Sequence, residues 1–123
     1  EEIYAPVRTF LEHKDYTTAI DYNENNLEAF FDRAKTLFLL GESQEAINDY
    51  TNVIERLPTD IEALNNRGLA FDSLGDYHLA IKDYKAVLKI DPEYAETLNN
   101  LGALYEALDN IEFAKDYYFN SSV

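Results

Sequence analysis

Two pairs of asparagines carry the most suggestive chemistry in this sequence. Asn65 and Asn66 lie in the stretch ALNNRGLAF, and Asn99 and Asn100 lie in TLNNLGALY, which begins 34 residues further along the chain. A carboxamide both donates and accepts hydrogen bonds, so one side chain can bind the N–H and the C=O of another peptide's main chain. The four asparagines are therefore candidate groups for holding an extended ligand.

The side chains that enzymes use most often are absent or scattered. Cysteine does not occur, which excludes thiol catalysis, disulfide bonds and thiolate metal sites. The two histidines, His13 and His78, have no metal-binding spacing. No glycine-rich phosphate loop and no Ser/His/Asp arrangement is apparent. We therefore expect no enzyme activity, no cofactor and no metal site.

The charge of the chain narrows the class of partner. Twenty-four acidic residues against ten basic ones give a net charge of −14. Such a field repels nucleic acid and anionic membrane surfaces and attracts basic segments, and no apolar run approaches the ~18 residues that a membrane span needs. We expect a protein or peptide partner of basic character, with no nucleic acid and no membrane. The alternative is that the acidity only keeps the domain soluble.

A repeat of 34 residues organises the elements that hold the asparagines. Aligned at this offset, the chain keeps the residue type in many columns. The matching columns are Phe30/Leu64/Leu98, Ala34/Gly68/Gly102, Leu37/Phe71/Tyr105, Ala46/Ala80/Ala114, Tyr50/Tyr84/Tyr118, Val53/Val87 and Pro58/Pro92. Agreement over this many columns indicates a true internal repeat.

Each repeat has the pattern of a helical hairpin. Leu64, Gly68 and Phe71 are spaced four and three residues apart, which places them on one stripe of a first helix. Gly75 supplies the left-handed residue that ends this helix, as Gly41 does one unit earlier. Pro92, and Pro58 in the preceding unit, stop the second helix at or before the preceding residue. One such hairpin is too small to bury its apolar face, so successive hairpins must stack.

The period and the pattern resemble the tetratricopeptide repeat (TPR) family over residues 27–123. The resemblance implies an all-α, right-handed superhelical solenoid of antiparallel helix hairpins that acts as a protein–protein interaction module. First helices line the concave surface, which in this family commonly holds an extended peptide. Two departures stand out: no Trp occupies the first signature column, and Asp109-Asn110 replaces the Gly-Asp turn between the helices.

The domain organisation follows from the spacing of the columns. Ala19 lies 27 residues before Ala46, whereas later units keep 34, so the first hairpin is degenerate and shortened. We expect a single domain, and because the chain begins with Glu1-Glu2 and contains no methionine, we expect a fragment of a longer protein. The predicted units are residues 1–26 (the shortened hairpin), 27–60, 61–94 and the incomplete repeat 95–123.

Helical geometry predicts which side chains face the concave groove. At 100° per residue, Asn66 projects about 200° and Asn65 about 100° from Leu64, away from the packing stripe. The resemblance implies that such asparagines grip the ligand backbone, although ordinary exposed asparagines would give the same pattern. The predicted peptide-binding residues are Asn65, Asn66, Asn99, Asn100, Glu62, Glu96, Asp32, Asp72, Glu106 and Phe31.

The predicted groove is acidic. Relatives that bind chaperone tails use lysines and an arginine here to clamp a terminal carboxylate, and in this chain the clamp is absent; the corresponding columns read Phe31/Asn65, Glu62/Glu96 and Asn100. A segment with basic side chains is the better candidate, and solvated surface glutamates are the alternative. Phe31, Phe38 and Leu39 lie off the packing stripe. They form either a pocket for a ligand side chain or a contact with the shortened first unit.

The last helix supports a second hypothesis. Its predicted exposed face carries Ile111, Phe113, Tyr117 and Tyr118, and no capping helix follows. We expect a continuation of the chain to cover this face; the alternative is that another copy or a partner covers it. The alternative function is therefore an oligomerisation or scaffold segment that acts through the C-terminal helix.

Overall fold

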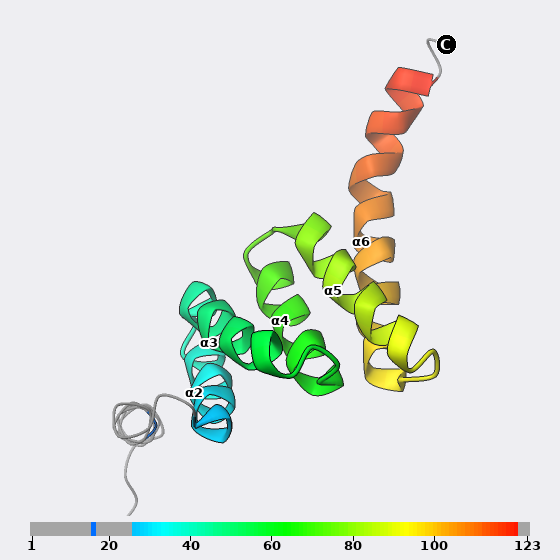
Figure 1. Ribbon diagram of the computed structural model, residues 1–123. Helices are drawn as coiled ribbons and strands as arrows, with labels where there is room; N and C mark the ends of the chain where they lie inside the picture. The colour runs from blue at the N-terminus through cyan, green and yellow to red at the C-terminus, as the bar shows by residue number, and fades with distance from the viewer. Residues whose placement is uncertain (1–15, 17–25, 121–123) are drawn as a thin grey trace, which may run out of the picture.

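Five helices in series make up the described part of the protein. The computed structural model describes Tyr16 and residues 26–120, with side chains as far as Asp109 (Figure 1). The predicted hairpin of residues 1–26 lies almost entirely outside the described residues. The helices are α2 (Leu27–Leu39), α3 (Ser43–Arg56), α4 (Ile61–Ser73), α5 (Tyr77–Ile90) and α6 (Ala95–Asn120). The predicted all-α fold is confirmed.

The helices stack as consecutive hairpins. α2 pairs with α3 and α4 pairs with α5; α3 packs on α4, and α5 packs on α6. The first helices of neighbouring hairpins also meet, α2 with α4 and α4 with α6. Each hairpin thus contacts its sequence neighbours, as expected for a solenoid of repeats.

Residues at the helix ends explain where the hairpins turn. Asn26 caps α2 by accepting a hydrogen bond from the Ala29 N–H at 3.0 Å, and Asp60 caps α4 in the same way. Gly41 and Gly75, with φ of 85° and 82°, end the first helix of each hairpin. Their backbone bonds complete the Schellman arrangement that favours glycine at this position. The sequence placed both turns correctly.

The core of each hairpin is built on a tyrosine packed against a small residue. Tyr50 and Tyr84 are the largest fully buried side chains of the described residues. A Cβ placed on Gly68 would lie 2.6 Å from Cε1 of the Tyr84 ring, closer than Cβ atoms approach their neighbours in real structures. Gly68 therefore permits a close approach of α4 and α5 that no larger residue would allow without a shift.

A repeated ion pair ties the two helices of each complete hairpin together. Arg33 contacts both carboxylate oxygens of Asp49 at 2.6 and 2.7 Å, and Arg67 contacts both oxygens of Asp83 at 2.8 Å. Arg67 also donates to Thr51 Oγ1 at 3.1 Å, which joins the second hairpin to the first. Sequence reasoning missed these pairs, although both members recur at the 34-residue period.

The third repeat differs from the prediction. We expected a turn at Asp109-Asn110, but α6 continues through it as one helix from Ala95 to Asn120. In Figure 1 the C-terminal half of α6 extends beyond the other helices. Two features explain the difference: Asp109 stands where Gly41 and Gly75 turn the chain, and the ion-pair columns hold Leu101 and Tyr117. Without the turn residue and the ion pair, continued helix is the better local solution.

Candidate functional site

Three glutamates in one repeat column mark one end of the predicted groove. Glu28, Glu62 and Glu96 each occupy the second position of α2, α4 and α6, and all three are exposed. None of them forms an ion pair with another residue in the described part of the chain. Each carboxylate also lies favourably in the first turn of its helix. The result is a row of negative charges that runs from hairpin to hairpin.

The pKa of Tyr94 reports the same negative field. Burial raises the pKa of the Tyr94 hydroxyl, and the carboxylates of Glu96, Glu62, Asp91 and Asp60 raise it further, because a negative phenolate is disfavoured beside them. Glu62 and Glu96 therefore act on one point between α4 and α6. A positively charged group at this point would be favoured for the same reason.

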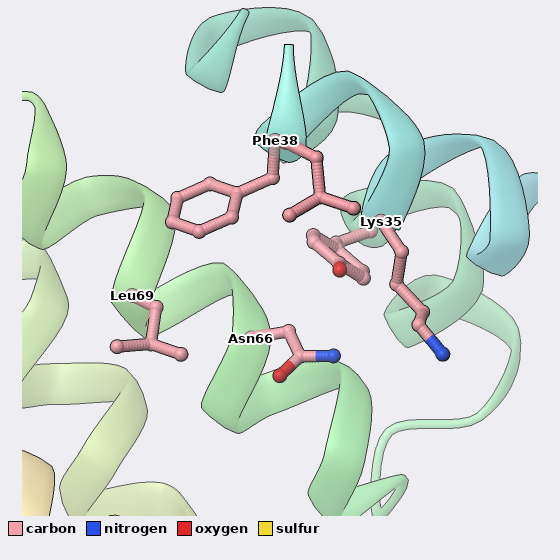
Figure 2. Close-up of a pocket in the computed structure, with 6 residues that line it drawn as sticks. Lys35, Phe38, Asn66 and Leu69 are labelled. Atoms are coloured by element: carbon pink, nitrogen blue, oxygen red, sulfur yellow. The ribbon is translucent and has the colours of Figure 1, made fainter. Parts of the chain in front are cut away.

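An apolar pocket opens between α2 and α4. It has a volume of about 190 Å³ and is lined by Lys35, Phe38, Leu39, Tyr50, Asn66 and Leu69. Figure 2 shows Phe38 and Leu69 facing each other from the two helices, with Asn66 and Lys35 toward the other end of the opening. The predicted pocket residues Phe38 and Leu39 both line it, whereas Phe31 does not.

Tyr50 and Asn66 connect this pocket to the core. Burial raises the pKa of the Tyr50 hydroxyl, a hydrogen bond with Asn66 opposes this rise, and the charges of Glu62 and Asp32 add to it. Asn66 is half-buried and thus has both a structural contact and access to the pocket. The polar groups at the pocket are an amide, a lysine and a buried phenol.

Phe31 lines a second cavity, of about 280 Å³. The cavity also contacts Glu28, Val53, Leu57 and Glu62 among its lining residues. The Phe31 ring packs edge-on against Tyr50 with centroids 5.7 Å apart, and Lys35 Nζ lies 5.5 Å from the Phe31 centroid. Phe31 is therefore part of the wall between α2 and the following helices, with one side open to the cavity.

The structure corrects the expectation for Asn65. We expected it to face the groove, but it is 1% exposed, and its Oδ1 accepts hydrogen bonds from Thr97 Oγ1 at 2.6 Å and Asn100 Nδ2 at 3.2 Å. A direction about 100° from the packing stripe points to the next hairpin rather than to solvent, because α6 packs there. Asn99, its counterpart one repeat later, is exposed.

The other predicted residues divide by exposure. Glu106 is exposed, whereas Asn100, Asp32 and Asp72 are half-buried, and burial raises the pKa of the Asp72 carboxyl. The Tyr84 hydroxyl is buried and has no hydrogen-bond partner in the described part of the chain. The predicted oligomer residues on α6, Ile111, Phe113, Tyr117 and Tyr118, have side chains outside the described residues.

The described residues contain neither a candidate metal site nor a candidate membrane span. No group of three His, Asp or Glu side chains within residues 26–109 has an arrangement that could hold a metal ion. Within the described helices, none is both long and apolar enough to cross a bilayer.

Comparison with known families decides the assignment. Two tetratricopeptide repeat models match the chain, one over residues 28–60 and one over residues 61–94, which together span more than half of it. The chain belongs to the tetratricopeptide repeat family. The predicted TPR solenoid is thereby confirmed. TPR proteins bind protein or peptide partners and are typically non-catalytic, so the fold is that of a protein–protein interaction module.

Solved TPR structures resemble this one closely. The first TPR of Spaghetti (RPAP3), bound to the HSP90 peptide SRMEEVD, is 28% identical with a TM-score of 0.74, over 78% of this chain and 76% of that one. The Arabidopsis OM64 TPR domain is 25% identical with a TM-score of 0.76, over 85% and 86%. A TPR protein from Parabacteroides merdae ATCC 43184 is 25% identical with a TM-score of 0.79, over 87% of this chain and 42% of its own. No curated protein sequence matched.

Proposed function

We propose that this TPR chain binds an extended segment with basic side chains along the surface formed by α2, α4 and α6. The observation that carries the proposal is the row of Glu28, Glu62 and Glu96, which is exposed and unpaired within the described residues. Unpaired carboxylates lose no internal partner when a ligand binds them. A basic ligand is attracted by this row and by the net charge of −14.

The repeat geometry suggests a spacing for the ligand. Stacked helices lie roughly 8–10 Å apart, and an extended peptide rises about 3.3 Å per residue. One glutamate of the row therefore corresponds to about three ligand residues. We expect the best ligand to carry Lys or Arg at about every third position, so that successive basic side chains meet Glu28, Glu62 and Glu96.

The pocket between α2 and α4 supplies an apolar anchor. Its volume of about 190 Å³ is below the range typical of whole small-molecule sites, and suits a single apolar side chain. Asn66 at the pocket can hydrogen-bond the ligand main chain, and Asn100, whose Nδ2 donates to Asn65, retains its Oδ1 to accept a bond. Two such bonds contribute about 0.5–1.5 kcal/mol each, so they set the register while charge and the anchor supply most of the affinity.

The charge of this groove is opposite to what an acidic peptide needs. The Spaghetti (RPAP3) domain is bound to SRMEEVD, a peptide with three acidic side chains. This chain has Glu62 and Glu96 where carboxylate-clamping relatives have lysine. We therefore expect a ligand of the opposite charge on a similar scaffold.

The test compares two peptides of opposite charge, and two variants that each remove one negative charge. A fluorescein-labelled peptide with Lys at every third position and one Leu is titrated by fluorescence anisotropy, beside the same peptide with Glu in place of Lys. We expect only the lysine peptide to bind. Glu62→Gln should weaken binding about 2- to 5-fold at low salt, as one partly exposed charge pair would. Glu55→Gln, an equal charge change at an exposed position of α3, should leave binding unchanged.

Two results would contradict the proposal. The first is equal binding of the lysine and glutamate peptides, and the second is equal loss of affinity in the Glu62→Gln and Glu55→Gln variants. Circular dichroism of each variant shows whether the fold is retained, so that a folding defect is not read as a binding defect.

A further inference from the structure

α6 has an exposed apolar face whose counterparts on α2 and α4 are buried or, at Phe71, half-buried. Leu98 and Tyr105 are 46% and 42% exposed. The residues in the same repeat columns of α2, Phe30 and Leu37, are only 8% and 3% exposed, and Leu64 of α4 is 5% exposed. In both hairpins the second helix covers these columns. On α6 this cover is missing, although its neighbouring stripe, with Leu101 and Leu104, is buried against α5.

The bare face is shaped for a particular side chain. In the second hairpin the Tyr84 ring lies against Gly68, so closely that a Cβ there would meet it at 2.6 Å. Gly102 stands in the same column between Leu98 and Tyr105, and nothing lies within 4 Å of its added Cβ. The face of Leu98, Gly102 and Tyr105, here called the α6 acceptor face, therefore matches a second helix that carries a tyrosine.

The chain contains such a helix, but not where its own acceptor face can receive it. By sequence, Ala114 and Tyr118 occupy the columns of the second-helix residues Ala80 and Tyr84. In the structure this segment is the continuation of α6 itself, which runs without a break from Ala95 to Asn120. A straight helix cannot fold back onto its own first half.

We propose that the acceptor face binds the C-terminal half of α6 from a second copy of the chain. The exchange is reciprocal: residues 111–120 of each copy lie antiparallel on Leu98, Gly102 and Tyr105 of the other. Each copy supplies the helix that its partner lacks, which is the arrangement of a domain-swapped dimer. Because the contact is two-fold and self-complementary, the assembly closes at two copies.

The repeat fixes the register of this dimer. Gly68 meets Tyr84 within the second hairpin, 16 positions further on. The same offset pairs Gly102 with Tyr118 of the second copy. The midpoint between positions 102 and 118 is Asn110, so the two α6 helices cross with Asn110 of one copy opposite Asn110 of the second copy. Figure 1 shows the C-terminal half of α6 projecting clear of the other helices, open to such an approach.

Light scattering after size-exclusion chromatography tests the proposal on the full chain. We expect wild type to be a dimer at high concentration. Gly102→Gln should be monomeric, because the larger side chain blocks Tyr118 of the second copy, while the open space around Gly102 leaves the fold of each copy intact. Ala103→Gln, the same new side chain one position away and also exposed, should remain dimeric.

A second variant tests the exchange itself. Asp109→Gly restores the residue that turns the first two hairpins and should allow residues 111–120 to close on their own acceptor face, which increases the monomer fraction. A wild-type chain that is monomeric at all concentrations would overturn the proposal. So would a dimer that Gly102→Gln leaves intact, or an Asp109→Gly variant with an unchanged dimer fraction.

Discussion

Two asparagines that look identical in the sequence have different roles at the residue scale. Asn65 is buried and accepts hydrogen bonds from Thr97 and Asn100, whereas Asn99 is exposed. Asn65→Ala leaves the buried Thr97 hydroxyl without its acceptor, and we expect it to lower the free energy of unfolding by about 1–3 kcal/mol. Asn99→Ala should be neutral or slightly stabilising, because alanine is the better helix former. Urea denaturation of both variants measures the difference.

The double variant Asn65→Ala, Thr97→Val provides the control. It removes both polar partners and should recover part of the lost stability, since no buried hydroxyl then lacks a partner. Equal stability of Asn65→Ala and Asn99→Ala would contradict the role assigned to Asn65.

Two glycines in one repeat column should respond oppositely to the same substitution. At Gly68 an added Cβ meets the buried Tyr84 ring, so we expect Gly68→Ala to destabilise the protein by about 1–3 kcal/mol. At Gly102 nothing within a single copy lies within 4 Å of the added Cβ, so at concentrations where the chain is monomeric Gly102→Ala should gain up to about 1 kcal/mol from helix propensity. In the proposed dimer the same Cβ would meet Tyr118 of the second copy, so this comparison is made on dilute protein. Thermal melts followed by circular dichroism compare the two, and a stabilised Gly68→Ala variant would show that Tyr84 can move.

The sequence predicted the surroundings of the site better than its individual contacts. Periodicity predicted that Asn66, Glu62 and Glu96 face away from the packing stripe; in the structure Glu62 and Glu96 are exposed and Asn66 is half-buried. It failed for Asn65, because the angular position within one helix does not show where the next hairpin packs. The contribution of Tyr50 to the pocket could not be predicted from the pattern of a single helix either, because the pocket forms only where α2 and α4 lie side by side.

At the scale of helices, local residues determined most of the boundaries. Gly41, Gly75, Pro58 and Pro92 predicted four helix ends, and the structure ends its helices at or just before each of them. The failure at Asp109 has the same physical basis, because a column that lacks glycine lacks the strong signal for a left-handed residue. Both the successes and the error therefore follow from whether a turn residue is present.

The ion pair between α4 and α5 should affect stability mainly when one partner is removed, because the other charge is then left unpaired. Asp83 is buried and Arg67 is mostly buried, so Asp83→Asn leaves an arginine without its carboxylate. We expect a loss of about 3 kcal/mol or somewhat less, because the guanidinium keeps some access to water. The double variant Arg67→Met, Asp83→Leu removes both charges and should be the more stable of the two. Urea denaturation measures the free energy of unfolding of both variants. A double variant less stable than Asp83→Asn would contradict this account.

At the scale of the whole molecule, α6 has three sides with different surroundings. One stripe, with Leu101 and Leu104, packs on α5; the acceptor face of Leu98, Gly102 and Tyr105 is bare; and Glu96, Asn99 and Glu106 are exposed on the groove side. The proposed dimer and the proposed groove therefore use different sides of one helix. A dimer would carry two grooves, and a partner with two basic segments would gain avidity without any new contact.

The net charge of −14 should give folding and peptide binding opposite responses to salt. Self-repulsion among like charges destabilises the compact state, and salt screens it, so we expect the melting temperature to rise by several degrees from low to physiological NaCl. Binding of the lysine peptide should weaken over the same range, because screening reduces the attraction to Glu28, Glu62 and Glu96.

KCl should give the same results as NaCl if screening is the cause. A melting temperature that falls with salt would mean that the Arg33–Asp49 and Arg67–Asp83 pairs outweigh the repulsion. Peptide binding that persists in salt would instead locate its affinity in the apolar pocket between α2 and α4.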